Sequence, residues 1–233
     1  MIANAWNSPG SCDVIDIVSS KPCKKIAQYP SRVQRAAGGI LDDKVVICGG
    51  YNLDTRSSTS SCYAHDPNTN TWTFLASMRI ARNSHSALVA QDKLWITGGL
   101  DSSGRTLSNT ECVYLNGSVV QGVDLPSGRW AHCMVDLRDG RVMLIGGYPT
   151  YKEAFFYHLS NRSFTRAPYL NEDRWDHACT LFQSVKHNNR SILLVAGGFK
   201  SGYKLTSVQI LDFTVPGAIW QTSEIVFSHS RYW

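Results

Sequence analysis

Short apolar runs rich in β-forming residues alternate with polar turns along the whole chain. A representative unit has apolar residues at 88–89 and 94–96, separated by the polar turn 91–93, and it ends with Gly98 and Gly99. This pattern is typical of a β-hairpin whose second strand is stopped by the glycine pair. No long window has apolar residues at the 3.6-residue spacing of a helix, so we expect an all-β chain.

The hairpin unit recurs four times at a nearly constant spacing. The four copies end in glycine pairs at Gly49-Gly50, Gly98-Gly99, Gly146-Gly147 and Gly197-Gly198. A fixed period of this size indicates a stacked repeat architecture. A second strand pair follows each glycine pair, and it is marked by turns such as Asp66-Pro67-Asn68 and by Trp72 or an aromatic residue near its place. Each period therefore predicts four antiparallel strands.

Four-stranded sheets at this spacing are typical of the blades of a β-propeller. The glycine pair after an apolar strand, the sequence HDPNTNTW at 65–72, and Arg-x-x-His before the next inner strand resemble the kelch repeat over residues 12–233. The resemblance implies a kelch-type β-propeller of four-stranded antiparallel blades. Two departures concern blade detail: the copy that begins at Arg35 lacks the histidine, and residues 115–117 replace the Asp-Pro turn.

The repeat boundaries predict an incomplete ring of about four and a half blades. We expect an N-terminal segment at 1–11, a half blade at 12–30, blades at about 34–78, 82–126, 129–168 and 174–224, and the start of another blade at 229–233. This arrangement contains five outer halves of blades but only four inner halves. An unclosed ring leaves a strand edge that can pair with another chain.

Residues that recur in every period are expected to build the blades. Each glycine pair ends a strand, and the recurring arginines are expected to bond loop carbonyls rather than a ligand. The recurring histidines could instead form a ring of metal ligands, but no Asp or Cys recurs beside all three, so we expect structural histidines. The recurring residues are Arg82, Arg129 and Arg174, and His85, His132 and His177.

Strand order places three kinds of loop at one end of the blades: the entry to the first strand, the loop from second to third strand, and the exit of the fourth. These loops span 51–60, 76–82, 100–108, 126–130, 148–153, 168–174 and 199–207, and they carry a net charge of +4. Aromatic and arginine side chains are typical of interaction surfaces, although some aromatics could only fill gaps between blades. The expected partner-binding residues are Arg56, Arg79, Arg105, Trp130, Tyr151, Lys152, Lys200 and Tyr203.

The cysteines and glycosylation sequons bear on the compartment. Cys12, Cys62 and Cys112 are 50 residues apart, which suggests one equivalent strand position. Cys23 and Cys48 would lie on strands next to Cys12 and Cys62, so we predict the disulfides Cys12–Cys23 and Cys48–Cys62, with buried thiols as the alternative. Disulfides would favour a secreted or cell-surface glycoprotein. The sequons are at Asn116, Asn161 and Asn189.

These features predict a non-enzymatic module that binds a protein or peptide, acidic or with an acidic segment, through the loops. We expect no catalytic residues, metal or cofactor, because no nucleophile elbow, phosphate loop or HExxH motif occurs. The charge of +5 is spread without a basic run longer than Lys24-Lys25, and no apolar stretch reaches about 18 residues, so we expect neither nucleic-acid binding nor membrane insertion. Met1–Gly10 has no signal-peptide pattern. The resemblance also allows the substrate-recognition propeller of an intracellular ubiquitin-ligase adaptor, or a propeller enzyme.

Overall fold

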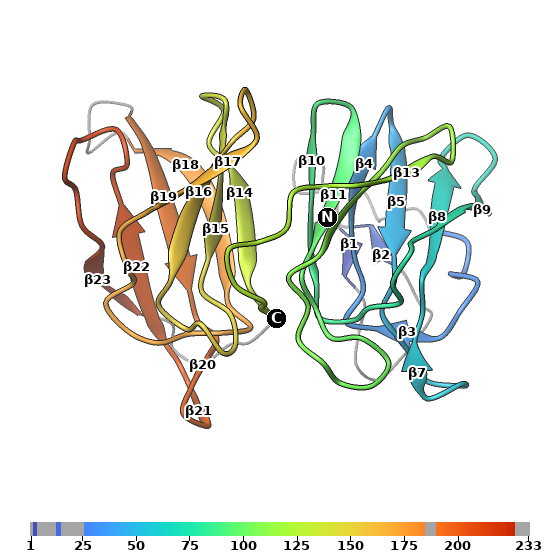
Figure 1. Ribbon diagram of the computed structural model, residues 1–233, viewed down its shortest axis with the longest axis horizontal. Coiled ribbons are helices and arrows are strands. Elements are labelled where there is room, and N and C mark those ends of the chain that lie inside the picture. The colour runs from blue at the N-terminus through green and yellow to red at the C-terminus, as the bar shows by residue number, and fades with distance from the viewer. Residues whose placement is uncertain (1, 4–12, 15–25, 185–189, 227–233) are drawn as a thin grey trace. The chain divides into compact units, whose positions relative to one another are not determined.

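The computed structural model describes residues 2–3, 13–14, 26–184 and 190–226. Every regular element in these ranges is a β-strand (Figure 1). Among the described residues, no helix has the length and apolar character needed to cross a membrane. The predicted Cys12–Cys23 disulfide, the sequon at Asn189 and the expected blade start at 229–233 lie outside the described residues.

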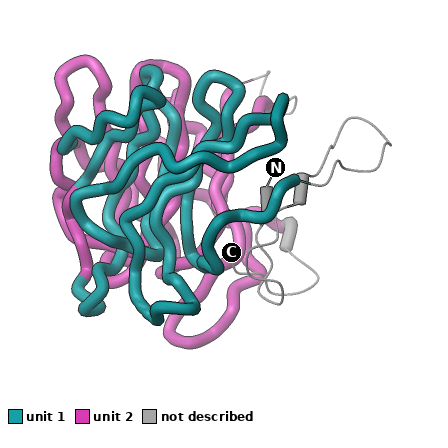
Figure 2. The backbone as a smooth tube through the Cα atoms, turned by 90° about the vertical axis from the view of Figure 1, so that its right-hand side faces the viewer, with its two compact units in different colours: residues 1–105, 110–122 teal, residues 106–109, 123–233 magenta. Residues whose placement is uncertain are grey.

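The chain divides into two compact units, coloured separately in Figure 2. Unit 1 comprises residues 1–105 and 110–122, and unit 2 comprises residues 106–109 and 123–233. Each unit contains two four-stranded antiparallel sheets whose strands follow one another in chain order.

Unit 1 holds the first two of these sheets. One sheet consists of β4 (Ala37–Leu41), β5 (Lys44–Cys48), β8 (Ser61–Asp66) and β9 (Thr71–Ser77). The other consists of β10 (Ser86–Ala90), β11 (Lys93–Thr97), β12 (Thr110–Val113) and β13 (Val119–Gln121). The tight β4–β5 and β10–β11 hairpins follow from the polar turn residues between their apolar strands, because Asp42, Asp43, Gln91 and Asp92 adopt positive φ.

Unit 2 repeats the arrangement. Its first sheet consists of β14 (Cys133–Asp136), β15 (Arg141–Ile145), β16 (Ala154–His158) and β17 (Ser163–Arg166). Its second sheet consists of β18 (Ala178–Ser184), β19 (Arg190–Ala196), β22 (Ser207–Leu211) and β23 (Gln221–Val226).

Three small sheets lie outside the four large sheets, and one of their strands, β2 (Asp13–Val14), falls in the expected half blade at 12–30. The small sheets are β1 (Ile2–Ala3) with β2, β3 (Val33–Gln34) with β6 (Tyr51–Asn52) and β7 (Ser57–Ser58), and β20 (Phe199–Lys200) with β21 (Tyr203–Lys204). The segments 51–60 and 199–207, which we expected to be loops, therefore each contain a short hairpin. These hairpins give the connections between second and third strands a defined backbone.

The core of unit 1 lies between its two sheets. Val46 and Cys62 from one sheet and Leu94, Ile96 and Val113 from the other are buried in a single apolar cluster. A full apolar side chain in such a cluster contributes about 1.5–3 kcal/mol by leaving water. Strand β4 approaches β10 closely because Gly39 has no side chain, since a Cβ there would lie 2.5 Å from Val89 Cγ2.

The core of unit 2 has the same construction. Val135, Met143, Leu193 and Val195 come from the two sheets and pack with Trp220, which is 1% exposed. The indole of Trp220 donates a hydrogen bond to the Pro168 carbonyl at 3.0 Å, so its one polar atom is satisfied inside the core.

Candidate functional site

The glycine pairs and the Arg-x-x-His motif form one joint between neighbouring sheets. In unit 1 the second glycine, Gly50, donates its N–H to the Arg82 carbonyl at 2.8 Å. The first glycine, Gly49, has φ +67° and leaves room for the next sheet, because a Cβ there would lie 2.7 Å from His85 Cε1. Both glycines are therefore required by close approach as well as by backbone conformation.

Unit 2 contains the same joint. Gly147 donates its N–H to the Arg174 carbonyl at 3.1 Å. A Cβ on Gly146 would lie 2.8 Å from His177 Cε1. The two motifs, which are far apart in each repeat, are thus the two halves of one contact between successive sheets.

The recurring histidines are packed side chains. His85 and His177 are 7% and 5% exposed. Burial, together with the nearby positive charges of Arg82 and Arg174, lowers the pKa of each to about 3. Among the described residues, no three His, Cys, Asp or Glu side chains gather closely enough to hold a metal ion. At neutral pH both rings are uncharged, and they fill the space above the glycines.

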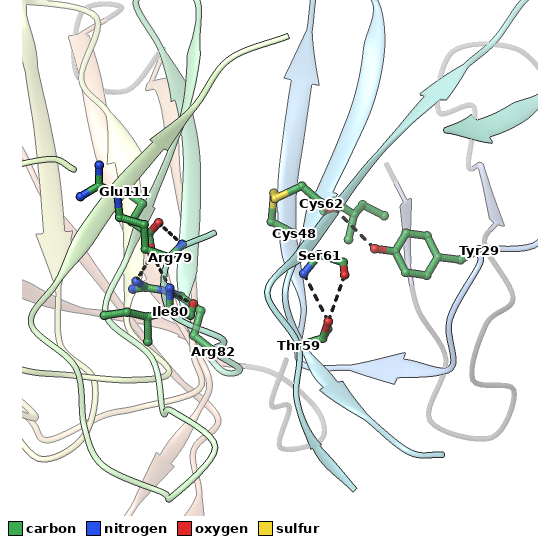
Figure 3. Close-up of a disulfide and its surroundings, with 10 residues drawn as sticks. Tyr29, Cys48, Thr59, Ser61, Cys62, Arg79, Ile80, Arg82 and Glu111 are labelled. Atoms are coloured by element: carbon green, nitrogen blue, oxygen red, sulfur yellow. Dashed lines mark hydrogen bonds and ion pairs between the residues drawn. A yellow bond between two sulfur atoms is a disulfide. The ribbon is translucent and has the colours of Figure 1, made fainter. Parts of the chain in front are cut away.

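Each recurring arginine is fully buried and bonds the glycine pair of its own sheet. Arg82 donates to the Gly98 carbonyl at 2.8 Å and to Glu111 Oε1 at 2.7 Å, as part of the cluster drawn in Figure 3. The Glu111 carboxylate also accepts the backbone N–H groups of Arg79 and Ile80. A buried charge is tolerated only when it is paired and hydrogen-bonded, and this network meets both conditions.

In unit 2 the corresponding arginines bond in the same way with different acids. Arg129 donates to the Gly146 carbonyl at 3.0 Å and to Glu153 at 3.1 Å. Arg174 donates to the Gly197 carbonyl at 3.0 Å, and its nearest carboxylate oxygen, on Glu172, is 3.8 Å away. Burial lowers the pKa of Arg129 and of Arg174 to about 10, so both remain charged at neutral pH.

The expected partner-binding residues of unit 1 stand on three separate loops. Arg56 has φ +53° in the β6–β7 hairpin, and Arg79 is exposed after β9. Arg105 is 82% exposed, while its backbone N–H and its Nε both bond Asp101. These bonds and those from Ser103 hold the pKa of the Asp101 carboxyl well below its ordinary value. Among the described residues, no hydrogen bond links one of these three arginines to another.

In unit 2 the loops gather a continuous row of aromatic rings. Tyr151, Tyr148, Trp130, Trp175 and Phe199 follow one another with centroid separations of 5.4, 5.3, 5.2 and 4.8 Å. Tyr148 is 40% exposed, and the other four rings are half-buried. We call these five residues the aromatic row, and residues 126–130, 148–153, 168–174 and 199–207 the unit 2 loop surface.

Two backbone bridges build the aromatic row. Trp130 pairs with Tyr148 and Trp175 pairs with Phe199, each through reciprocal N–H to carbonyl bonds. The same bridge exists in unit 1, where it is made by Asn83 with Leu100. Since an asparagine and a leucine form the bridge equally well, the blade structure does not require aromatic residues at these positions.

Basic residues flank the aromatic row. Lys152 lies 3.9 Å from Asp173, whereas Lys200 and Tyr203 face each other in the β20–β21 hairpin, with Tyr203 77% exposed. The unit 2 loop surface carries the exposed lysines Lys152, Lys200 and Lys204, whereas its arginines are fully buried. The structure thus places Trp130, Tyr151, Lys152, Lys200 and Tyr203 on one surface.

Comparison with known proteins places this geometry in a family. The family model for the kelch motif matches residues 32–79. The chain contains a kelch motif and is similar to kelch-repeat proteins. It is 24% identical over 210 residues to kelch-like protein 26 of Danio rerio, which covers 85% of this chain and 33% of that protein. It is also 31% identical over 109 residues to alpha-scruin of Limulus polyphemus, covering 44% of this chain and 12% of that protein.

Other comparisons support the fold and show how much of each relative the kelch chain covers. The influenza virus NS1A-binding protein homolog of Mus musculus is 32% identical over 92 residues, which are 38% of this chain and 14% of that protein. The kelch chain thus spans a third or less of the length of these relatives. The solved structure of YjhT superposes with a TM-score of 0.80 at 14% identity, covering 97% of this chain and 80% of that one. The predicted fold class, a kelch-type β-propeller, is confirmed.

The cysteines of the kelch chain depart in part from the expectation. A disulfide joins Cys48 to Cys62 on the adjacent strands β5 and β8, with Cα atoms 4.1 Å apart (Figure 3). A second disulfide, which we did not predict, joins Cys133 to Cys179 at a Cα separation of 6.0 Å. It links the first strands of the two sheets of unit 2.

The inferred equivalence of the regularly spaced cysteines was wrong. Cys62 lies opposite Cys48, directly before the glycine pair, whereas Cys112 lies opposite Trp95, three residues before Gly98. The residue equivalent to Cys62 is Thr110, which lies opposite Thr97, directly before Gly98. An even sequence spacing of 50 therefore does not give an equal position in the sheet.

The two described sequons lie in exposed hairpin turns. Asn116 Oδ1 accepts the Ser118 hydroxyl at 2.7 Å, and Asn161 Oδ1 accepts the Ser163 hydroxyl at 2.8 Å. Both turns join a third strand to a fourth, so within each unit they lie at the end of the sheets opposite the partner loops. Glycosylation of these residues remains a prediction.

Several important residues were not found from the sequence. Trp175 and Phe199 complete the aromatic row. A comparison of the residues that follow the recurring arginines would have shown asparagine after the first of them and tryptophan after the last two. The acidic partners Glu111, Glu153 and Glu172 occupy three different positions relative to their arginines. A search for a repeated residue cannot detect them.

Proposed function

We propose that the chain is a non-enzymatic kelch module that binds a protein or peptide through the loops at one end of its sheets, the unit 2 loop surface above all. The observation that carries this proposal is the pair of bridges Trp130–Tyr148 and Trp175–Phe199. They place large aromatic side chains where the repeat also accepts asparagine and leucine. Aromatic residues that the fold does not need, set beside exposed lysines, are typical of interaction hot spots.

The exposed lysines of the β20–β21 hairpin, Lys200 and Lys204, support an acidic partner or an acidic segment within it. Exposed charges of this kind act mainly on the association rate and lose strength with salt. Opposite turns, such as 159–162 between β16 and β17, are short and polar, as expected for a surface without such a role.

A charge-reversal comparison tests the proposal. Lys200→Glu changes an exposed lysine on the unit 2 loop surface, and Arg162→Glu makes the same change in the opposite turn. We expect a partner that the unaltered chain and Arg162→Glu both retain from a cell extract, and that Lys200→Glu and Trp130→Ala lose. Circular dichroism verifies that every variant is folded. A partner lost with Arg162→Glu but kept by Lys200→Glu would contradict the proposed surface.

Two versions of this function differ in the cellular compartment where the protein would act. The similarity to kelch-like protein 26 over 85% of the chain favours the substrate-recognition propeller of an intracellular adaptor. The two disulfides favour a secreted or cell-surface module. Alkylation of the protein as it is isolated from its native cells decides between them, because reduced cysteines would support the intracellular version and oxidised pairs the secreted one.

A further inference from the structure

The unit 2 loop surface offers mainly hydrogen-bond donors. In the ranges that the structure describes, the indole N–H groups of Trp130 and Trp175 have no acceptor. Lys152, Lys200 and Lys204 add ammonium groups, which can only donate. A ligand that fits this surface must therefore bring acceptors.

The three carboxylates of the same surface already have partners. Glu153 accepts from Arg129 and from the Ser127 hydroxyl at 2.9 Å. Glu172 accepts from the Ser207 hydroxyl at 3.0 Å, and Asp173 faces Lys152. A sugar or an added β-strand would bring its own hydroxyl or N–H donors, and these would find no unpaired carboxylate among the described residues of this surface.

A proline-rich segment has the complementary chemistry. Proline has no backbone N–H, and the polyproline II helix forms no internal hydrogen bonds, so its carbonyls are open acceptors. Its prolines pack well in aromatic-lined grooves, and its preformed shape lowers the entropy lost on binding. We propose that the unit 2 loop surface binds an extended proline-rich segment that carries an acidic residue, with the prolines on the aromatic row and the acid at Lys200. This inference rests on the proposed function.

The spacing of the rings agrees with this ligand. Three residues of a polyproline II helix advance about 9 Å. Neighbouring rings of the aromatic row are 4.8–5.4 Å apart, so two ring steps span up to about 10 Å, which can accommodate one turn of the ligand. Prolines three residues apart can then contact alternate rings, while Trp130 and Trp175 donate to carbonyls between them.

A selection from random peptides tests the inference without assuming a sequence. A phage-displayed library of 12-residue peptides is panned against the immobilised full chain, and selected peptides are synthesised with a fluorescein label for anisotropy. We expect enrichment of prolines spaced by three with Asp or Glu beside them. We expect Trp130→Ala and Tyr148→Ala to weaken binding at least tenfold, and Lys200→Glu at least threefold at low salt. Ile219→Ala, which removes a 70% exposed side chain outside the loop surface, should change it less than twofold.

The possible outcomes distinguish a failure of this inference from a failure of the proposed peptide-binding function. Selected peptides that bind through Trp130 without proline enrichment would overturn the proline-rich ligand and leave the peptide-binding function intact. A failure to select any peptide, with tight binding instead to labelled oligothymidylate or a labelled oligosaccharide, would overturn both. Equal binding by the unaltered chain and a folded Trp130→Ala variant would overturn the placement on the aromatic row.

Discussion

Acidification should unfold this protein through its two uncharged histidines. His85 and His177 have pKa values lowered to about 3 in the folded chain by burial, against an ordinary value of 6.5. Between these values the unfolded chain binds more protons than the folded chain, so stability falls as the pH falls through 6.5. At pH 5 each histidine should cost about 2 kcal/mol relative to pH 7.5, or about 4 kcal/mol for both. That is a large part of the stability of an ordinary domain.

Urea unfolding followed by tryptophan fluorescence at pH 7.5 and pH 5.0 measures this loss. His85→Gln and His177→Gln replace each ring by a group that does not titrate, and each should halve the difference between the two pH values even if it lowers stability at both. His158→Gln, which changes a histidine bonded to Thr165 near the protein surface, serves as the matched control and should leave the difference unchanged.

Carboxylates affect the stability of the folded chain in a lower pH range than these histidines do. Hydrogen bonds from Arg105 and Ser103 keep the pKa of Asp101 below its ordinary value of 3.8, so its contribution is lost only as the pH falls below about 4. A difference between pH 7.5 and 5.0 that stays the same in both histidine variants would therefore refute the reasoning.

Three further predictions concern the joints and cross-links. Glu111→Gln leaves a fully buried arginine without its carboxylate, and urea unfolding should show a loss of about 3–5 kcal/mol. Replacing Cys133 and Cys179 together by serine opens a 46-residue loop and should cost about 4 kcal/mol under non-reducing conditions, with no loss if the disulfide does not form in solution. Gly49→Ala should cost about 3 kcal/mol and Gly140→Ala about 1 kcal/mol by thermal unfolding, because both have positive φ but only Gly49 meets neighbouring atoms; equal costs would exclude the steric joint.

The repeat made the fold class predictable from sequence. Glycine pairs and apolar runs recur because each sheet meets the same local demands, namely a positive φ after the second strand and close packing on the next sheet. A structural requirement that recurs in every sheet produces a regular period in the sequence. The β-propeller could therefore be predicted from the spacing of residues such as Gly49 and Gly98, and its kelch type from the resemblance of the recurring motifs.

The partners of the recurring arginines could not be predicted in this way. Arg82 is neutralised by Glu111 on the third strand, whereas Arg129 uses Glu153 before that strand. Any carboxylate within reach satisfies a buried guanidinium, so its position in the chain is free to vary. The Cys133–Cys179 disulfide escaped prediction because it joins two sheets, while neighbouring strands of one sheet were the pairs considered.

The aromatic row could be predicted from the sequence only in part. Trp130 and Tyr151 were selected because aromatic side chains are typical of interaction surfaces, but their neighbours Trp175 and Phe199 were not singled out. Only the structure shows that the bridges of two repeats place their rings in contact. The binding roles of these residues remain predictions.

The joint between His85 and Gly49 has a consequence for how such a chain can change. The ring of one repeat occupies the volume that a side chain of the preceding repeat would fill. A Cβ on Gly49 would also lie 2.6 Å from the Arg82 carbonyl oxygen, so a smaller residue in place of the histidine would not by itself make room for a larger one at the glycine. The glycine is therefore held constant by the backbone of the adjoining repeat, and whole periods can be gained or lost as long as each joint stays intact.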